Sequence, residues 1–264
     1  MTPLLIFPEL LTENTAPELM ALKGKLQNPQ YHPEGDAYVH TLAVYNVAHD
    51  IATRDGLDEV DTNILALAAL CHDFGKATHT FWSDEKQTWT SPGHDVAGEE
   101  PTRAFLTRHN VKPEYQERIV CLVREHMVHV YLQKDAKPSK KLAAGLLDRI
   151  EGKTTLEELQ RLVEADKSGR PPLPKHVPAT FLLLAEVCRE VVEERRLKAL
   201  EPEPFLTGKE LLELNVPQGP AIGTLLKKLA ELQKDGSVAT RENAIDYVQQ
   251  VEVNVKKIIE SSQG

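Results

Sequence analysis

The sequence predicts an all-α protein, a helical bundle with a helical extension at its C-terminus, and three observations support this fold class. Apolar residues recur at the three- and four-residue spacing of amphipathic helices through most of the 264 residues. Good N-cap residues begin these stretches, and glycine or proline ends them. No stretch shows the sustained alternation of apolar and polar residues that is typical of a half-buried strand.

The first part of the chain predicts one short and one long helix. Residues 1–35 are rich in proline and favour at most a short helix over residues 16–25. Asp36 is a suitable N-cap for a helix that extends to about residue 54, where Asp55-Gly56 ends it. The apolar face of this helix would consist of Val39, Leu42, Ala43, Val47 and Ile51.

The next helix carries the stretch on which the site prediction depends. Capped by Asp61 or Thr62, it would extend to about residue 74, and its apolar run over residues 64–71 indicates burial in the core. The run ends in the adjacent residues His72 and Asp73. An imidazole beside a carboxylate can bind a divalent cation, or the two can simply hydrogen-bond to each other in the core.

A long polar loop, residues 76–95, follows this helix. A loop of about twenty residues in a compact domain is usually functional or mobile. Its two tryptophans, Trp82 and Trp89, could stack on a nucleobase, although packing the loop onto the protein is the more common use. The loop ends at His94-Asp95, which leads into the next helix.

Helices account for the rest of the chain. Their expected ranges are 96–108, 113–129, 141–150, 155–168, 179–200, 207–212, 220–234 and 240–259. A capping box of Thr154 or Thr155 with a glutamate three residues later begins the fourth of these. Several prolines between residues 171 and 178 form a rigid linker, so residues 1–172 are assigned to one domain and residues 173–264 to the C-terminal extension.

Composition limits the classes of function. The net charge of −9 argues against an extended nucleic-acid footprint, but not against a small anionic ligand or an RNA end. No apolar run approaches the roughly 20 residues that span a bilayer, and the N-terminus lacks the basic segment of a signal peptide. The three scattered cysteines predict buried thiols in the reducing cytoplasm.

The histidines point to a metal site. Nearly all ten lie between residues 32 and 129. Each member of the set His40, His72, Asp73 and Asp166 lies on or at the end of a predicted helix, beside an apolar face. Two imidazoles and two carboxylates suit Mn, Fe, Co, Ni or Zn, with Mg possible. Asp166 follows an apolar helical segment and would point into the core, or else face solvent at the end of its helix.

This pattern resembles the HD phosphohydrolase superfamily, whose motif is His…His-Asp…Asp. Five segments are similar to the HD portion of bacterial tRNA nucleotidyltransferases, the CCA-adding enzymes: Tyr31-His32-Pro33-Glu34-Gly35-Asp36 with His40-Thr41-Leu42, Leu70-Cys71-His72-Asp73-Phe74-Gly75-Lys76, Gly93-His94-Asp95, Glu125-His126, and Ala165-Asp166-Lys167-Ser168-Gly169-Arg170. Residues 206–211 and 217–223 resemble the C-terminal part of those enzymes, so the resemblance covers most of residues 3–250.

Two departures limit what the resemblance implies. No glycine-rich nucleotide loop with a pair of spaced aspartates precedes residue 30, so nucleotide addition to tRNA is not expected of this sequence. Glu125 stands beside His126 where related sequences often have two adjacent histidines, which affects any role that needs the second imidazole.

The resemblance implies a set of roles. His40, His72, Asp73 and Asp166 would bind one metal, which would lower the pKa of a bound water and polarise a phosphoryl oxygen. Asp73, His94 and His126 are the catalytic candidates. His94 and His126 would either complete a second metal site or bind the phosphate and protonate the leaving oxygen.

Three further residues are candidates for substrate binding. Lys76 would approach a phosphate or merely favour the helix dipole, and Arg170 would clamp a phosphate or face solvent. His32 would border the cleft or serve only in a turn. The remaining histidines His49, His79, His109 and His129 are expected to be surface or partly buried residues without a role in the site.

The expected function is metal-dependent hydrolysis of phosphomonoesters and 2′,3′-cyclic phosphodiesters in small nucleotides or RNA 3′ ends. One alternative is a non-catalytic tRNA-binding or dimerisation module, which the acidic charge disfavours. Another is a (d)NTP or second-messenger hydrolase, which the sequence resembles only at the level of the bare motif. The charged helix near residues 185–200 and the C-terminal helices could also pair two copies into a homodimer.

Overall fold

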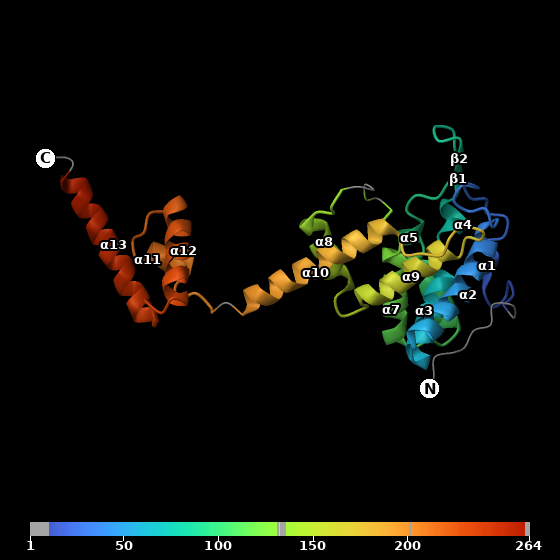
Figure 1. Ribbon diagram of the computed structural model, residues 1–264, viewed down its shortest axis with the longest axis horizontal. Helices are drawn as coiled ribbons and strands as arrows, with labels where there is room; N and C mark the ends of the chain where they lie inside the picture. Colours follow the sequence, from blue (N-terminus) through green and yellow to red (C-terminus); the bar gives the residue numbers. More distant parts are fainter. Residues whose placement is uncertain (1–10, 131, 133–135, 201, 262–264) are drawn as a thin grey trace. The chain divides into compact units, whose positions relative to one another are not determined.

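The structure is a computed structural model that describes residues 11–130, 132, 136–200 and 202–261, with side chains up to residue 251 (Figure 1). The helical prediction is confirmed, with one small two-stranded sheet as the exception. The apolar segment 1–8, for which no signal peptide is predicted, lies outside the described residues. None of the helices in the described part of the chain has the length and apolar composition needed to cross a lipid bilayer.

The predicted helices are present in order along the chain, together with α4, β1 and β2, which the sequence did not predict. They are α1 (Pro17–Met20), α2 (Ala37–Asp55), α3 (Glu59–Cys71), α4 (Lys76–His79), β1 (Phe81–Ser83), β2 (Thr88–Thr90), α5 (His94–Ala97), α6 (Glu99–Arg108), α7 (Pro113–Glu125), α8 (Lys140–Ile150), α9 (Leu156–Ser168), α10 (Ala179–Ala199), α11 (Gly208–Glu213), α12 (Pro220–Lys234) and α13 (Arg241–Ser261). The single helix expected over residues 96–108 is interrupted at Gly98, which separates α5 from α6.

Contacts divide the chain into two compact units, with the boundary in the sequence between Val192 and Glu193. The sequence places this boundary twenty residues earlier, after the proline-rich linker. The buried face of α10, from Phe181 to Val191, belongs to the hydrophobic core of the first unit. The second unit has a small core of its own, formed around Leu211, to which α11, α12 and α13 contribute. The likeness of residues 173–264 to the tail of tRNA nucleotidyltransferases stays a prediction.

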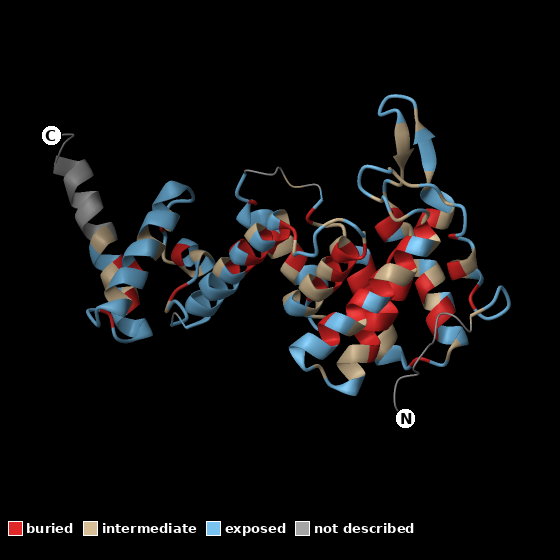
Figure 2. Cartoon of the chain, turned by 45° about the vertical axis from the view of Figure 1, so that its right-hand side comes forward, coloured by how far each residue is buried: buried red, intermediate tan, exposed pale blue. Residues whose placement is uncertain are grey.

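The core of the first unit is built around α3, whose residues from Asn63 to Cys71 are all buried (Figure 2). This helix packs against α2, α7 and α9, and α9 also packs against α2. Burial on all sides explains why the run from Ile64 to Cys71 is apolar without a polar face. The end of α3 therefore delivers His72 and Asp73 into the interior of the bundle.

The buried face of α2 differs from the apolar face that the sequence predicts. Val39 is 44% exposed, whereas His40 is completely buried. The buried stripe follows His40, Val44, Val47 and Ile51, which recur at three- and four-residue spacing. The helix is thus rotated so that an imidazole, rather than a valine, faces the core. The N-cap is the predicted one, because the Asp36 carboxylate accepts a hydrogen bond of 2.9 Å from the backbone N–H of Val39.

The N-caps of α3 and α9 can be compared with those that the sequence predicts. Asp58, rather than Asp61 or Thr62, caps α3 and accepts from the backbone N–H of Asp61 at 2.8 Å. The prediction of Asp61 as the cap was wrong because acidic residues also favour the first turn of a helix, where Asp61 lies. At α9, Thr155 and Glu158 form the predicted capping box.

The loop over residues 76–95 contains more structure than the sequence predicts. It holds the short helix α4 and an antiparallel hairpin of β1 and β2, in which Trp82 pairs with Trp89. The two indole rings pack edge to face with their centroids 5.8 Å apart, and Trp82 is 46% exposed. Three-residue strands are too short to show a period-two pattern, which explains why the sequence did not reveal them.

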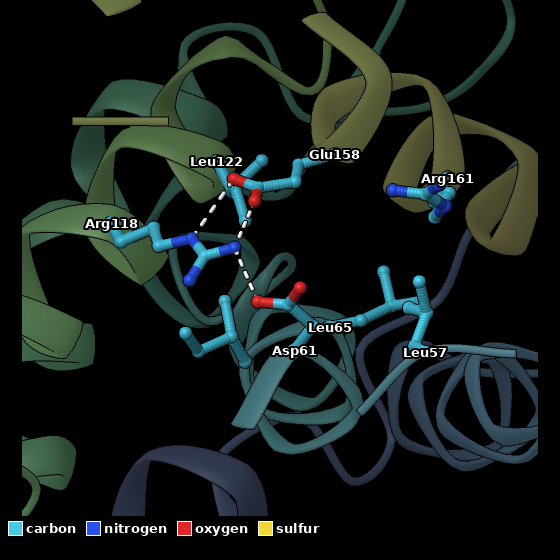
Figure 3. Close-up of a pocket in the computed structure, with 8 residues that line it drawn as sticks. Leu57, Asp61, Leu65, Arg118, Leu122, Glu158 and Arg161 are labelled. Atoms are coloured by element: carbon cyan, nitrogen blue, oxygen red, sulfur yellow. Dashed lines mark hydrogen bonds and ion pairs between the residues drawn. The ribbon is translucent and has the colours of Figure 1, made fainter. Parts of the chain in front are cut away.

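A half-buried arginine joins three of the bundle helices. Arg118 of α7 reaches between Asp61 of α3 and Glu158 of α9, and the three side chains line a small cavity of about 10 Å³ (Figure 3). Its Nη2 lies 2.6 Å from Oδ1 of Asp61 and also pairs with Glu158. This network lies among α3, α7 and α9, and it contains none of the candidate metal ligands.

Candidate metal centre

Five elements of the first unit each contribute a buried polar side chain to one cluster. His40 comes from α2, His72 and Asp73 follow α3, and Asp166 lies in the last turn of α9. Two further histidines complete the cluster, His94 at the start of α5 and His126 directly after α7. None of these side chains belongs to a residue that is more than 4% exposed. Because α2, α3, α7 and α9 pack together, residues far apart in the sequence meet here.

Three of the imidazoles are held by backbone carbonyls in the same way. Nδ1 of His72 donates to the carbonyl oxygen of Ala69 at 2.7 Å. Nδ1 of His94 donates to Ser91 at 2.6 Å, and Nδ1 of His126 donates to Val123 at 2.6 Å. A carbonyl oxygen can only accept, so Nδ1 carries the proton in each ring. The lone pair of each Nε2 is therefore free to bind a cation.

Two of these Nε2 atoms lie close to the carboxylate of Asp73. Nε2 of His72 lies 3.3 Å from Oδ2 of Asp73, and Nε2 of His94 lies 3.2 Å from Oδ1 of the same residue. Nε2 of His40 lies 3.0 Å from Oδ1 of Asp166. The His126 ring stands edge-on to both His72 and His94, with centroid distances of 5.3 and 5.2 Å.

The arrangement fits one or two divalent cations. Nε2 of His72, of His94 and of His126 is buried without a hydrogen-bond partner, which is costly unless something satisfies it. Among the described residues, three groups have ligand atoms within 4.8 Å of one another. Two of them share Asp73, namely His40 with His72 and Asp73, and Asp73 with His94 and His126; the third is His32 with Glu34 and His40. Imidazole and carboxylate donors suit Mn, Fe, Co, Ni and Zn. Asp73 belongs to two of these groups, so its carboxylate stands where two cations could share it.

The ionisation states suit cation binding. Burial alone would raise the pKa of the Asp73 carboxyl, but His72 and Lys76 hold it well below its usual range. Burial acts in the same sense on Asp166, where Arg170 and His40 hold the pKa low. Both carboxylates are thus anionic. Burial, with His94 and His72 nearby, lowers the pKa of His126 to about 3, so its imidazole is neutral.

Two basic side chains adjoin the carboxylates. Lys76 is buried, and its Nζ lies 2.7 Å from Oδ2 of Asp73 and donates to Oε1 of Gln27 at 2.7 Å. Arg170 donates from Nη2 to Oδ1 of Asp166 at 2.6 Å. Neither residue is the solvated charge that the sequence left open as an alternative. Both stand beside the candidate ligands.

His32 also belongs to this region. Its ring packs edge-on to the ring of His40 with the centroids 4.7 Å apart, and burial lowers its pKa to about 4. Its Nδ1 lies 2.8 Å from Oε1 of Glu34. Glu34 was part of the quoted motif, but sequence reasoning gave it no role. Its position in a turn before the helix offered no signal that its carboxylate would be buried.

Two residues lie close to His126 in the sequence but outside the groups of candidate ligands. His129, expected at the surface or partly buried, is 7% exposed, and burial lowers its pKa to about 4. Glu125, the neighbour of His126, accepts two hydrogen bonds of 2.8 Å from Arg149 of α8. Its side chain thus points toward α8 and does not contribute to the clusters of candidate metal ligands.

Comparisons with known proteins agree with the sequence motif. The family profile described as "HD domain" matches residues 37–168. The A-adding tRNA nucleotidyltransferase of Deinococcus radiodurans is 31% identical over 247 residues, which cover 90% of this chain and 51% of that protein. The CC-adding tRNA nucleotidyltransferase of Thermus thermophilus is 30% identical over 230 residues, covering 86% and 47%. A multifunctional CCA protein of Xylella fastidiosa is 34% identical over 163 residues, covering 60% and 35%.

The chain spans about half or less of the length of these curated relatives. It is homologous to the CCA-adding tRNA nucleotidyltransferases over the portion that contains the matched domain. No solved structure gives a significant match.

Proposed function

This chain belongs to the HD domain family, a superfamily of metal-dependent hydrolases, and we propose that it is a metal-dependent phosphohydrolase. The observation that carries the proposal is the convergence of four buried imidazoles with Asp73 and Asp166. Three of these imidazoles present an Nε2 atom without a hydrogen-bond partner. Buried polar atoms of this kind are rare in cores that serve only to stabilise a fold.

His40, His72, Asp73 and Asp166 would hold one cation, and Asp73 with His94 and His126 a second. A bound divalent cation supplies Lewis acidity at a phosphoryl oxygen and favours deprotonation of water at neutral pH. The second-cation role for His94 and His126 is favoured over proton donation, because both rings carry their proton on Nδ1, where a backbone carbonyl accepts it. Their Nε2 atoms have a lone pair and no proton to give.

Lys76 and Arg170 would bind the substrate phosphate. Each lies within 2.7 Å of a carboxylate proposed as a ligand, so a phosphate brought to the ligands meets an ammonium and a guanidinium. Charge-assisted hydrogen bonds from such groups are stronger than neutral ones, and the guanidinium can bind two phosphate oxygens at once. His32 has a neutral ring whose Nδ1 faces Glu34. It would accept a hydrogen bond at Nε2, for which a ribose hydroxyl is a suitable donor.

The proposed substrates are 2′,3′-cyclic phosphates and phosphomonoesters of nucleotides or of RNA 3′ ends. Support comes from the homologues, which are named for adding nucleotides to tRNA and so work at an RNA 3′ end. Addition of water to a cyclic phosphate breaks one P–O bond to a ribose oxygen, which takes up a proton. Addition of a second water to the monoester would release inorganic phosphate.

The test combines metal analysis with a substrate screen. Purified protein is assayed for metal content and then for hydrolysis of 2′,3′-cyclic, 2′- and 3′-nucleotides with Mn, Ni, Co or Mg. We expect turnover that a chelator abolishes, that Asp166→Ala removes, and that the exposed control His176→Ala retains. Turnover of only deoxynucleoside triphosphates or 3′,5′-cyclic nucleotides would reject the proposed substrates. Binding of tRNA by a protein that holds no metal would indicate the non-catalytic module instead.

A further inference from the structure

We propose that Glu34 is a positioning residue that fixes the orientation and tautomer of His40, so that Nε2 of His40 faces the cation. This inference rests on the metal site proposed above. His40 is completely buried, and the side chain of Glu34 is 2% exposed. The Oε1 atom of Glu34 lies 2.8 Å from Nδ1 of His40 and 2.8 Å from Nδ1 of His32.

The short distances from Oε1 of Glu34 require a proton on Nδ1 of each of the two rings. The contact with His32 is a hydrogen bond, whereas the contact with His40 is a close electrostatic contact that is not aligned as a hydrogen bond. In either case, an unprotonated nitrogen 2.8 Å from a carboxylate oxygen would place two lone pairs against each other. Nδ1 of His40 therefore carries a proton. Nε2 is hydrogen-bonded to Oδ1 of Asp166 at 3.0 Å and lies 3.8 Å from Oδ2 of Asp73, so a bound cation would take the place of a proton on this atom.

The Glu34 carboxylate stands against both imidazole rings, with Oε1 2.8 Å from Nδ1 of each. A buried anion against the remote nitrogen of a ligand histidine fixes the ring and makes Nε2 a stronger donor to a cation. The second oxygen, Oε2, is buried without a hydrogen-bond partner, so the carboxylate is committed to the two imidazoles through Oε1.

His40 differs in this respect from the other three histidines of the cluster. His72, His94 and His126 are held by backbone carbonyls, which no side-chain substitution removes. His40 lies within α2, where its side chain is held instead by a residue from the preceding turn. The orientation of this one histidine can therefore be altered by mutation without changing a ligand.

The turn that contains Glu34 holds this residue beside the first turn of α2. Gly35 has a φ of +132°, a conformation that residues with a side chain rarely adopt. Asp36 then caps α2 and also accepts from the backbone N–H of Gly24 at 2.7 Å, which ties the turn to an earlier segment. The rigid turn places Glu34 against His40 and leaves little freedom for a replacement side chain to rearrange.

The experiment compares metal affinity in Glu34→Ala, Glu34→Gln and the control Glu100→Gln, which alters an exposed glutamate in the first turn of α6. Ni²⁺ or Mn²⁺ is titrated into metal-free protein against a competing chelator. We expect Glu34→Ala to weaken binding by about 10–100-fold, as removal of such carboxylates does elsewhere. Glu34→Gln, which keeps an acceptor oxygen but loses the charge, should lose less, and the control should bind like the parent.

A second readout needs no metal. Histidine-selective ¹⁵N NMR of the metal-free protein at alkaline pH reports the tautomer of each ring. We expect Nδ1 of His40 to be protonated in the parent and to lose its proton in Glu34→Ala, where the hydrogen bond to Asp166 favours a proton on Nε2, while His72 stays unchanged. Melting curves establish that each variant is folded.

The outcomes separate the inference from the proposed function. Failure of the parent protein to bind any of these metals would remove the proposed metal centre, and the NMR measurement would then decide on the role of Glu34 alone. Equal affinity and an unchanged His40 tautomer in Glu34→Ala would overturn the inference. Loss of one whole equivalent of metal, with unchanged affinity for the rest, would also overturn it, because Glu34 would then be a ligand together with His32 and His40.

Discussion

The two oxygens of Asp73 face different histidines: Oδ1 lies 3.2 Å from Nε2 of His94, and Oδ2 lies 3.3 Å from Nε2 of His72. The histidines belong to separate segments, one at the start of α5 and the other after α3. A carboxylate in this position can hold two cations at once. The two groups of candidate ligands, which share Asp73, have the same implication.

We therefore predict two metal equivalents per chain, with Asp73 required for both. His126→Ala should reduce the metal content from two equivalents to one, because His126 belongs only to the group with His94. Asp73→Ala should reduce it to near zero. Elemental analysis after dialysis against buffered Mn²⁺ or Ni²⁺ measures this, with the exposed His176→Ala as the control. A parent protein that holds one equivalent, and keeps it in His126→Ala, would contradict the bridging role.

Arg170 gives a prediction about substrate binding. Its side chain is 13% exposed, and its Nη2 atom lies 2.6 Å from Oδ1 of Asp166. Loss of a hydrogen bond between charged groups costs about 1.5–3 kcal/mol, so Arg170→Ala should raise KM by about 10–100-fold. Arg170→Lys should recover part of this, since a lysine keeps the charge without the planar fork.

Metal affinity distinguishes this role from an effect on the ligand. Removal of a cation from beside Asp166 should not weaken binding of a metal cation, so the metal affinity of Arg170→Ala should equal or exceed that of the parent. The exposed Arg196→Ala serves as the control. If KM changes no more in Arg170→Ala than in Arg196→Ala, Arg170 does not bind the phosphate.

Substitution of Gly75, which lies next to the cluster, should displace His94. A Cβ atom added to Gly75 would lie 2.0 Å from the backbone oxygen of His94 and 2.7 Å from the backbone nitrogen of Gly98. Because both neighbours are backbone atoms, α5 must move, and such overpacking typically costs about 1–3 kcal/mol or more. We expect Gly75→Ala to be destabilised by that amount in urea denaturation and to lose the metal equivalent that depends on His94.

Gly145 supplies the matched control for this experiment. It lies in α8, and a Cβ atom there would meet only the far end of the Arg149 side chain at 3.5 Å. Gly145→Ala should therefore be neutral, or stabilise the protein by up to about 1 kcal/mol through helix propensity. Similar behaviour of the two variants would show that the close approach at Gly75 does not hold α5 in place.

The sequence predicted the helices and the members of the cluster because both leave local signals. The apolar run before His72 and Asp73 predicted a buried helix, and α3 is buried along that run. The face of α2 was predicted less well. Counting apolar residues put Val39 in the core, whereas the fold buries His40, since the packing of α2 against α3 and α9 decides the rotation. A buried imidazole carries no hydrophobic signal.

Features that depend on contacts between distant segments could not be predicted. Glu34 is a polar residue in a turn, and only the folded arrangement reveals its contact with His40. The β1–β2 hairpin has strands of three residues, too short for a pattern. The salt bridges of Arg118 join α7 to α3 and α9, although nothing near Arg118 in the sequence indicates its partners.

The pairing of Arg118 with Glu158 predicts how stability depends on pH. Burial alone would raise the pKa of Glu158, but Arg118 and Thr154 lower it below the ordinary value of 4.5. A carboxyl whose pKa is lower in the folded state stabilises the fold above the unfolded-state pKa, and this stabilisation is lost as the pH falls through the folded-state pKa. Glu158→Gln should therefore cost about 1.5–3 kcal/mol of unfolding free energy at neutral pH. The difference from the parent should shrink as the pH falls below about 4.5.

The chain offers a close control in Glu157→Gln. Glu157 is exposed and lies in the same first turn of α9, so both variants change the interaction with the helix dipole alike. A glutamine at position 158 can still complete the capping box with Thr155, which leaves the ion pair with Arg118 as the difference. Urea denaturation at neutral pH and at about pH 4 measures both variants. Equal losses in the two variants at neutral pH would mean that the link between α7 and α9 does not stabilise the bundle.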